Sequence, residues 1–150
     1  MAEAVRLSRE GMRRNAGGPF GCVVARDGRI IGSGYNEVVA TNDPTAHAEI
    51  LAIRRACAEL GTFRLADCKI YASCEPCPMC LAAIYWARIR GIFYANAQED
   101  AAAIGFDDAK FYNELSMDPS GRSVPRTRIA GDEAKKVFAE WQEKADRILY

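Results

Sequence analysis

The sequence SCEPCPMC at residues 73–80 constrains the fold more than any other feature of this chain. Its last two cysteines, Cys77 and Cys80, stand three residues apart, and the mostly apolar run 79–87 follows them. Thiols with this spacing at a helix start lie on one face and can bind a single metal ion. The apolar run predicts a helix that is buried on most of its faces. We therefore expect a metal site at the start of a buried helix.

A second pattern, TAHAE at residues 45–49, stands at the start of another expected helix and contains the chain's only histidine, His47. A lone histidine is more often a satisfied surface or core residue than a ligand. A Cys-x-x-Cys pair alone is also found in redox motifs and in halves of structural zinc sites. Taken together, His-x-Glu upstream and Pro-Cys-x-x-Cys downstream form the pattern that is typical of zinc deaminases.

The chemistry explains the residue types. His47, Cys77 and Cys80 would hold one zinc ion per subunit and leave a fourth position for a water, whose pKa falls toward about 7. Glu49 would move the protons. Positions two apart in a helix diverge by about 200°, so His47 and Glu49 can face one site only at the helix start. Cys74 as a fourth ligand would instead give a closed, structural zinc site.

Composition limits the other possibilities. The chain has 150 residues, and 49% of them are hydrophobic, so we expect a single domain over residues 1–150. Lysine plus arginine equals aspartate plus glutamate at 20 each, which argues against nucleic acid as a partner. No apolar run has the length of a signal peptide or a membrane span, so a cytoplasmic protein without membrane contact is expected. Its six cysteines are then expected to be reduced.

Hydrophobic periodicity and turn residues give the expected elements. An Asp-Gly pair at residues 27–28 predicts a tight hairpin turn. Beyond residue 98 the pattern weakens into a loop, with a possible edge strand near 124–129. The expected order around a mixed sheet is a helix at 2–14, strands at 20–25 and 29–35, a helix from 43–45 to 60, a strand at 68–72, a helix at 79–87, a strand at 91–95 and a final helix at 132–148.

Five motifs resemble the cytidine deaminase-like superfamily of zinc deaminases, and within it the bacterial guanine deaminases over nearly the whole chain. The resemblance implies an α/β protein with a three-layer α/β/α fold and a mixed five-stranded sheet. It implies a hydrolase acting on a cyclic amidine, which converts guanine to xanthine and ammonia in purine metabolism. It also implies a homodimer whose C-terminal segment, about 118–150, packs on or exchanges with the partner subunit. The motifs lie at residues 17–21, 42–49, 73–80, 83–88 and 105–108.

The same resemblance implies that Asn36 and Asp108 bind the purine through hydrogen bonds and that Phe20, Trp86 and Tyr150 enclose it. Guanine presents adjacent N1–H and 2-amino donors, and one carboxylate can accept from both. Each residue also has a structural interpretation. Asn36 can end a strand, and Asp108 can cap a helix. Phe20 and Trp86 can belong to the core, and Tyr150 can be a frayed terminus.

Other functions stay open. The substrate could be guanosine, cytosine, a triazine such as ammeline or adenosine in tRNA, although a tRNA enzyme should carry a basic face. From a different class, the chain could be a non-catalytic zinc-stabilised binding domain.

Overall fold

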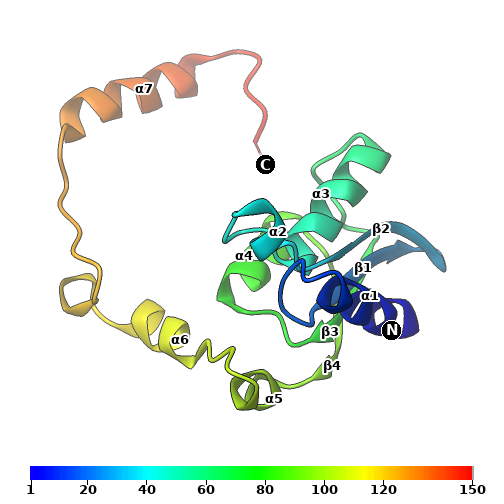
Figure 1. Ribbon diagram of the computed structural model, residues 1–150. Coiled ribbons are helices and arrows are strands. Elements are labelled where there is room, and N and C mark those ends of the chain that lie inside the picture. Colours follow the sequence, from blue (N-terminus) through cyan, green and yellow to red (C-terminus); the bar gives the residue numbers. More distant parts are fainter. Residues whose placement is uncertain (150) are drawn as a thin grey trace. The chain divides into compact units, whose positions relative to one another are not determined.

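The computed structural model describes residues 1–149, and the chain forms two compact units, Met1–Ala109 and Lys110–Tyr150 (Figure 1). The first unit contains the sheet and most of the helices. In chain order the elements are α1 (Ala2–Arg13), β1 (Gly21–Arg26), β2 (Arg29–Tyr35), α2 (Val38–Thr41), α3 (Ala48–Leu60), β3 (Lys69–Cys74), α4 (Pro78–Trp86), β4 (Gly91–Asn96), α5 (Gln98–Ala103), α6 (Ala109–Ser116), the 3-10 helix η1 (Pro119–Gly121) and α7 (Gly131–Glu143).

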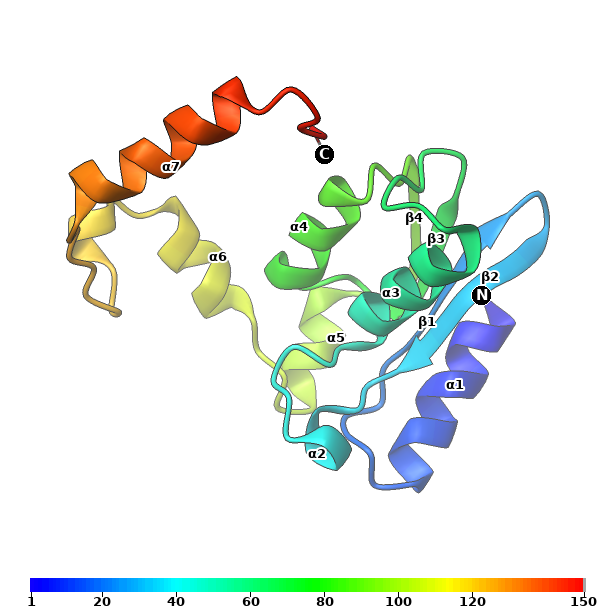
Figure 2. The ribbon, with the colours of Figure 1, turned by 90° about the horizontal axis from the view of Figure 1, so that it is seen from above.

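The sheet has the strand order β2-β1-β3-β4. Strand β1 is antiparallel to both of its neighbours, whereas β3 and β4 are parallel. Helix α1 covers one face of the sheet, and α3 and α4 lie on the other face (Figure 2). Because β3 and β4 are parallel, the segments that follow their last residues start at the same edge of the sheet.

Close approach between layers explains two glycines. A Cβ atom on Gly21 would lie 2.2 Å from the backbone oxygen of Ala4 in α1, and one on Gly32 would lie 2.3 Å from that of Ala52 in α3. Only glycine permits these distances. The helices can therefore pack directly on the hairpin, and the largest fully buried side chains fill the remaining space: Leu65, Ile70, Ile84, Val24, Cys22, Cys68 and Cys80.

The expected α/β/α layers, the hairpin and the mixed sheet are confirmed, but several boundaries are wrong. The second long helix begins at Ala48 rather than at 43–45, because the Asp43 carboxylate accepts hydrogen bonds from both the backbone N–H and the hydroxyl of Thr45 and closes a turn there. The final helix ends at Glu143 instead of 148. The short helices α2, α5 and α6 were missed.

The sheet has four strands within the described residues, not five. The possible edge strand at 124–129 has no strand pairing: it begins with a bend at Val124 and continues without regular structure. Its Pro125 has no N–H for a ladder, and Val124 and Ile129 are 72% and 80% exposed, so no apolar face anchors the segment.

The second unit is held by local hydrogen bonds. The Arg122 guanidinium donates to the carbonyl oxygens of Leu115 and Met117 at the end of α6, each at 3.2 Å. The Asp118 carboxylate accepts from the N–H of Ser120 and so caps η1. No residue of α7 is buried.

Candidate metal centre and active site

His47 and Cys77 occupy equivalent places, each as the N-cap residue of a helix. His47 precedes α3 with φ −71° and ψ 152°, and Cys77 precedes α4 with φ −62° and ψ 167°. Both backbones are extended, so neither side chain follows the helical rotation. Glu49 lies in the first turn of α3. The extended backbone of His47 thus removes the divergence of about 200° that a regular helix would impose between His47 and Glu49.

The side chains of His47, Cys77 and Cys80 meet with their ligand atoms within 4.8 Å of one another. The Nδ1 atom of His47 lies 3.6 Å from the Sγ atom of Cys77 and 3.5 Å from that of Cys80. A tetrahedral zinc ion with bonds of about 2.3 Å to sulfur and about 2.0 Å to nitrogen separates these atoms by roughly 3.5 Å. The three side chains therefore fit zinc.

The thiols of the cluster differ in acidity. A hydrogen bond from Cys80, helped by a weaker one from His47, lowers the pKa of the Cys77 thiol to about 4, although burial acts in the opposite direction. The same hydrogen bond with Cys77, together with burial, raises the pKa of Cys80. The hydrogen bond with Cys77 also raises the pKa of His47. One thiolate is thus already available to a metal ion, and a bound dication would favour the second.

Glu49 is buried beside this cluster and is 7% exposed. Burial raises the pKa of its carboxyl group, and the charge on Cys77 raises it further, whereas a backbone N–H lowers it. A carboxyl group with a raised pKa beside a metal-activated water is suited to moving protons near neutral pH. The role of Glu49 as proton carrier stays a prediction, which this placement supports.

Cys74 does not join the cluster, although it is buried nearby. Its Sγ atom lies 3.5 Å from the backbone oxygen of Ala97 and donates to it. Burial raises the pKa of this thiol to about 11, and the carboxylates of Glu49 and Asp108 contribute to that rise. Cys74 is absent from the group whose ligand atoms lie within 4.8 Å of one another, so the geometry favours three protein ligands and an open position over the closed alternative.

Asn36 follows β2 and is 5% exposed, one of three buried polar side chains among the described residues, with Glu49 and Ser73. Its Oδ1 atom accepts from the N–H of Val38 at 3.2 Å, and its N–H donates to the oxygen of Phe20. Asn36 thus directly follows the strand, as the structural interpretation expects, and its side chain binds the first residue of α2, whose N-cap is Glu37. Contact with a substrate stays a prediction.

Asp108 does not cap the following helix. The neighbouring Asp107 does so, since its carboxylate accepts from the N–H of Ala109 at 2.9 Å. The half-buried carboxylate of Asp108 instead accepts from the side-chain amide of Gln98 at 2.6 Å. The charge of Asp108 also makes a small contribution to the raised pKa of the Cys74 thiol, which lies at the end of β3 before the loop to Cys77.

The aromatic residues of the expected site are distributed unevenly. Phe20 packs edge-on against Phe106, with ring centroids 4.9 Å apart, and so joins the Asp108 segment to the loop before β1. Trp86 is 62% exposed and lies at the end of α4 opposite to Cys77. Tyr150 lies outside the described residues. The sequence did not predict that Phe106 contacts Phe20 or that Gln98 binds Asp108, although Phe106 lies within the motif at residues 105–108.

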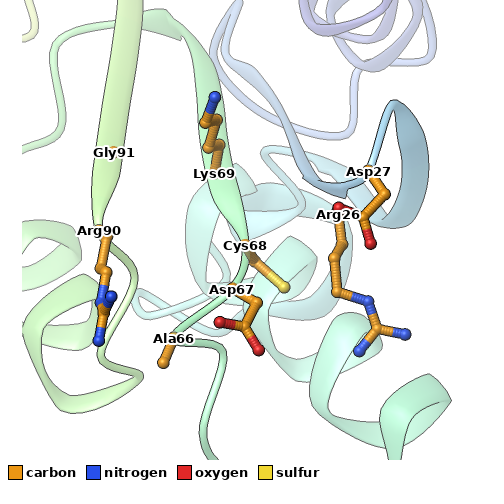
Figure 3. A pocket seen from close by; sticks show the side chains of 8 residues that line it. All are labelled: Arg26, Asp27, Ala66, Asp67, Cys68, Lys69, Arg90 and Gly91. Atoms are coloured by element: carbon orange, nitrogen blue, oxygen red, sulfur yellow. The ribbon is translucent and has the colours of Figure 1, made fainter.

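A hollow of about 570 Å³ lies at the other edge of the sheet, where β3 and β4 begin (Figure 3). Its wall includes Arg26, Lys69, Arg90 and Asp67. The view shows Lys69 and Arg90 directed away from each other and Arg26 on the far side of Asp67. Because these charges do not converge on one point, the hollow does not compete with the metal cluster as a functional site.

Comparison with known proteins agrees with this geometry. Residues 1–96 match the family described as the cytidine and deoxycytidylate deaminase zinc-binding region. This range includes the three clustered ligands and Glu49. The chain belongs to this family of zinc-dependent deaminases, and zinc is its metal.

Among individual proteins, the chain is similar to the guanine deaminase of Bacillus subtilis, with 47% identity over 150 residues that cover 100% of this chain and 96% of that protein. The X-ray structure of guanine deaminase from Bacillus subtilis superimposes with a TM-score of 0.96 and 48% identity, covering 99% and 95% of the two chains.

Two further relatives are more distant. The structure of NE0047 in complex with 2,6-diaminopurine has a TM-score of 0.68 and 28% identity, over 99% of this chain and 82% of that one. The tRNA-specific adenosine deaminase of Aquifex aeolicus is 42% identical over 126 residues, which cover 84% of this chain and 81% of that protein. Within the described residues, no helix is long and apolar enough to cross a membrane.

Proposed function

We propose that this chain catalyses the zinc-dependent hydrolytic deamination of guanine to xanthine and ammonia. One observation carries the reaction type: His47, Cys77 and Cys80 converge with zinc-like spacing beside the buried Glu49. The similarity to guanine deaminase over the full length of the chain supports the choice of substrate.

The division of work follows from the side chains. His47, Cys77 and Cys80 would hold the zinc ion, which would supply a water made acidic enough to react at neutral pH. Glu49 would accept a proton from the water and give it to a ring nitrogen. It would then take the second proton from the hydroxyl group now on the ring carbon and give it to the amine, which leaves as ammonia. Burial of Glu49 excludes bulk water, which would compete for these protons.

Asp108 would select the base. Its carboxylate accepts from the adjacent N1–H and 2-amino groups of guanine and so presents C2 for attack. Cytosine and adenine lack this pair of donors beside the reacting amino group. Asn36 would bind the purine by a further hydrogen bond, and Phe20, Trp86 and Tyr150 would enclose it.

The alternatives differ in what they require. Adenosine in tRNA needs a basic surface, and the chain has no net positive charge at pH 7. Guanosine needs room for a ribose, and cytosine or ammeline needs a different hydrogen-bond pattern. Guanine offers two adjacent donors to the Asp108 carboxylate and needs neither a basic surface nor room for a ribose.

A panel of guanine, guanosine, cytosine, adenine and ammeline, read by ammonia release from the zinc-loaded protein, tests the substrate. We expect guanine to react fastest, and faster turnover of cytosine would refute the role of Asp108. Glu49→Gln should keep its zinc, and its turnover should fall by about a hundredfold to ten-thousandfold, because general acid-base catalysis contributes that much. Glu59→Gln, an exposed site on the same helix, is the matched control.

We further propose that the protein is a homodimer in which the segment 118–150 packs on or exchanges with the partner. Support comes from two surfaces that are considered separately. Helix α7 has an apolar side with Val137, Phe138 and Trp141 exposed by 61%, 74% and 41%. On the sheet, Tyr71 and Phe93 stack with centroids 4.9 Å apart, and Phe93 is 44% exposed. Apolar surfaces of this kind mark protein interfaces.

Subunit mixing tests the exchange. Neither a Glu49→Gln subunit nor a subunit that ends at residue 117 should be active alone. If the segment crosses, a mixture should regain activity, because the Glu49→Gln subunit lends its segment to the site with an intact Glu49. A mixture without activity, or a monomer by light scattering, would refute the exchange. The cytoplasmic location stays a prediction.

A further inference from the structure

The contact between Gln98 and Asp108 joins the start of α5 to the segment before α6. The amide Nε2 of Gln98, the first residue of α5, donates to Oδ1 of Asp108 at 2.6 Å, and both residues are half-buried. A hydrogen bond to a charged acceptor is stronger than one between neutral groups. It fixes both the position and the rotation of the carboxylate.

The backbone that carries Gln98 is itself bound to the loop that leads to the metal ligands. The Cys74 thiol donates to the oxygen of Ala97 at 3.5 Å. The N–H of Glu75 donates to the oxygen of Asn96 at 2.9 Å. Because Cys74 and Glu75 directly precede the loop to Cys77, Gln98 starts from a position that is fixed relative to the metal cluster.

Within residues 1–149, Gln98 is the only residue that donates a hydrogen bond to the Asp108 carboxylate, although Phe106 nearby packs on Phe20. Asp108 follows Gly105, which has a φ of +93°, and precedes α6 without capping it. The Phe106 N–H is bound to Ala101, but the segment 106–108 has no regular structure. The carboxylate therefore depends on Gln98 for its orientation.

We infer that Gln98 is a positioning residue that sets the Asp108 carboxylate against the metal loop and thereby determines the preference for a base with two adjacent donors. This rests on the proposed function, in which Asp108 binds the base. An ionised carboxylate offers about four lone-pair sites. Gln98 occupies one, so acceptor sites remain for both guanine donors. A neutral amide also leaves the negative charge available for the base, which an arginine or lysine would offset.

Two variants separate positioning from simple space filling. Gln98→Leu removes the donor, and Gln98→Glu keeps the shape but places a second carboxylate beside Asp108. We expect KM for guanine to rise roughly tenfold to a hundredfold in Gln98→Leu and further in Gln98→Glu, since hydrogen bonds to charged groups contribute that much. Zinc content should be unchanged, and kcat should change less than KM. Glu99→Gln, at an exposed position next to Gln98 on α5, is the control and should match wild type.

A readout without turnover completes the test. In the zinc-loaded protein, the side-chain amide resonance of Gln98 should move when Asp108 is replaced in Asp108→Ala. Wild-type KM in both Gln98→Leu and Gln98→Glu, or an unmoved resonance, would overturn the inference. Failure of the proposed function has a different signature: wild type would deaminate another base of the panel. Gln98→Leu and Gln98→Glu would then be measured on that base. A raised KM would support the positioning role of Gln98, and an unchanged KM would overturn it.

Discussion

The units Met1–Ala109 and Lys110–Tyr150 hold their groups in place by different means. In the first unit, glycines let helices touch strands, and Glu49 and Asn36 are buried between elements. In the second unit, no residue of η1 or α7 is buried, and order comes from short-range hydrogen bonds. The difference teaches that metal and proton chemistry is placed where several elements fix each side chain. The second unit offers exposed apolar side chains, among them Val137, Phe138 and Trp141, which suit contact with another protein surface.

Removing one zinc ligand is expected to have the largest effect and to leave the second unit alone. Cys77→Ala should lose zinc and reduce ammonia formation by about three orders of magnitude or more, because the metal contributes several kcal/mol to catalysis. Hydrogen exchange should accelerate at the starts of α3 and α4 and stay unchanged in α7. Zinc content and exchange rates are the measurements.

Cys57→Ala provides the control, since Cys57 lies on α3 outside the metal cluster. It should keep zinc and activity. Retained zinc in Cys77→Ala, or an exchange response in α7 as large as that in α4, would contradict the contrast between the units.

Glycine substitutions test the packing difference directly. A Cβ atom on Gly17 would lie 2.0 Å from Oδ1 of Asn36, whereas one on Gly121 would meet nothing within 4 Å. Gly17→Ala should therefore reduce the free energy of unfolding by about 1–3 kcal/mol and raise KM, because Asn36 must shift. Gly121→Ala should stay within about 0.5 kcal/mol of wild type. Urea unfolding measures both, and equal costs would break the comparison.

The sequence was informative where local chemistry decides structure. The hairpin at Asp27-Gly28 and the buried helix after Cys77 follow from turn residues and apolar runs, and both are confirmed. The ligand set followed from residue type and spacing and agrees with the observed cluster. The start of α3 was mistaken because Asp43 and Thr45 satisfy each other in a turn, which competes with a helix cap.

Long-range contacts were beyond this reasoning. No periodicity indicates that Gln98 donates to Asp108 or that Phe20 packs on Phe106, because each pair is joined only by the fold. The fifth strand was wrong for a related reason. A strand needs a partner edge, and the segment 124–129 contains a proline and lacks a buried side.

The smallest expected effect is a pH response confined to the second unit. Hydrogen bonds from Ser123 lower the pKa of Glu114 from 4.5, and those from Ser120 lower the pKa of Asp118 from 3.8. Groups with a lowered folded pKa stabilise above their unfolded pKa, and the contribution is lost as pH falls through the folded value. The amide resonance of Ser123 should therefore move toward unstructured values only below pH 4.5, and that of Ser120 only below pH 3.8, the ordinary pKa values of the two carboxyl groups.

The carboxyl pKa values of the two units are shifted in opposite directions. Burial raises the pKa of Glu49 in the first unit, whereas hydrogen bonds from Ser120 lower the pKa of the exposed Asp118 in the second. Asp118→Asn should abolish the titration at the Ser120 amide and leave the Ser123 amide titrating with Glu114. If the Ser120 amide still titrates in that variant, its response comes from another group. The capping carboxylate would then not be what orders η1, and the second unit would need a source of order other than its local hydrogen bonds.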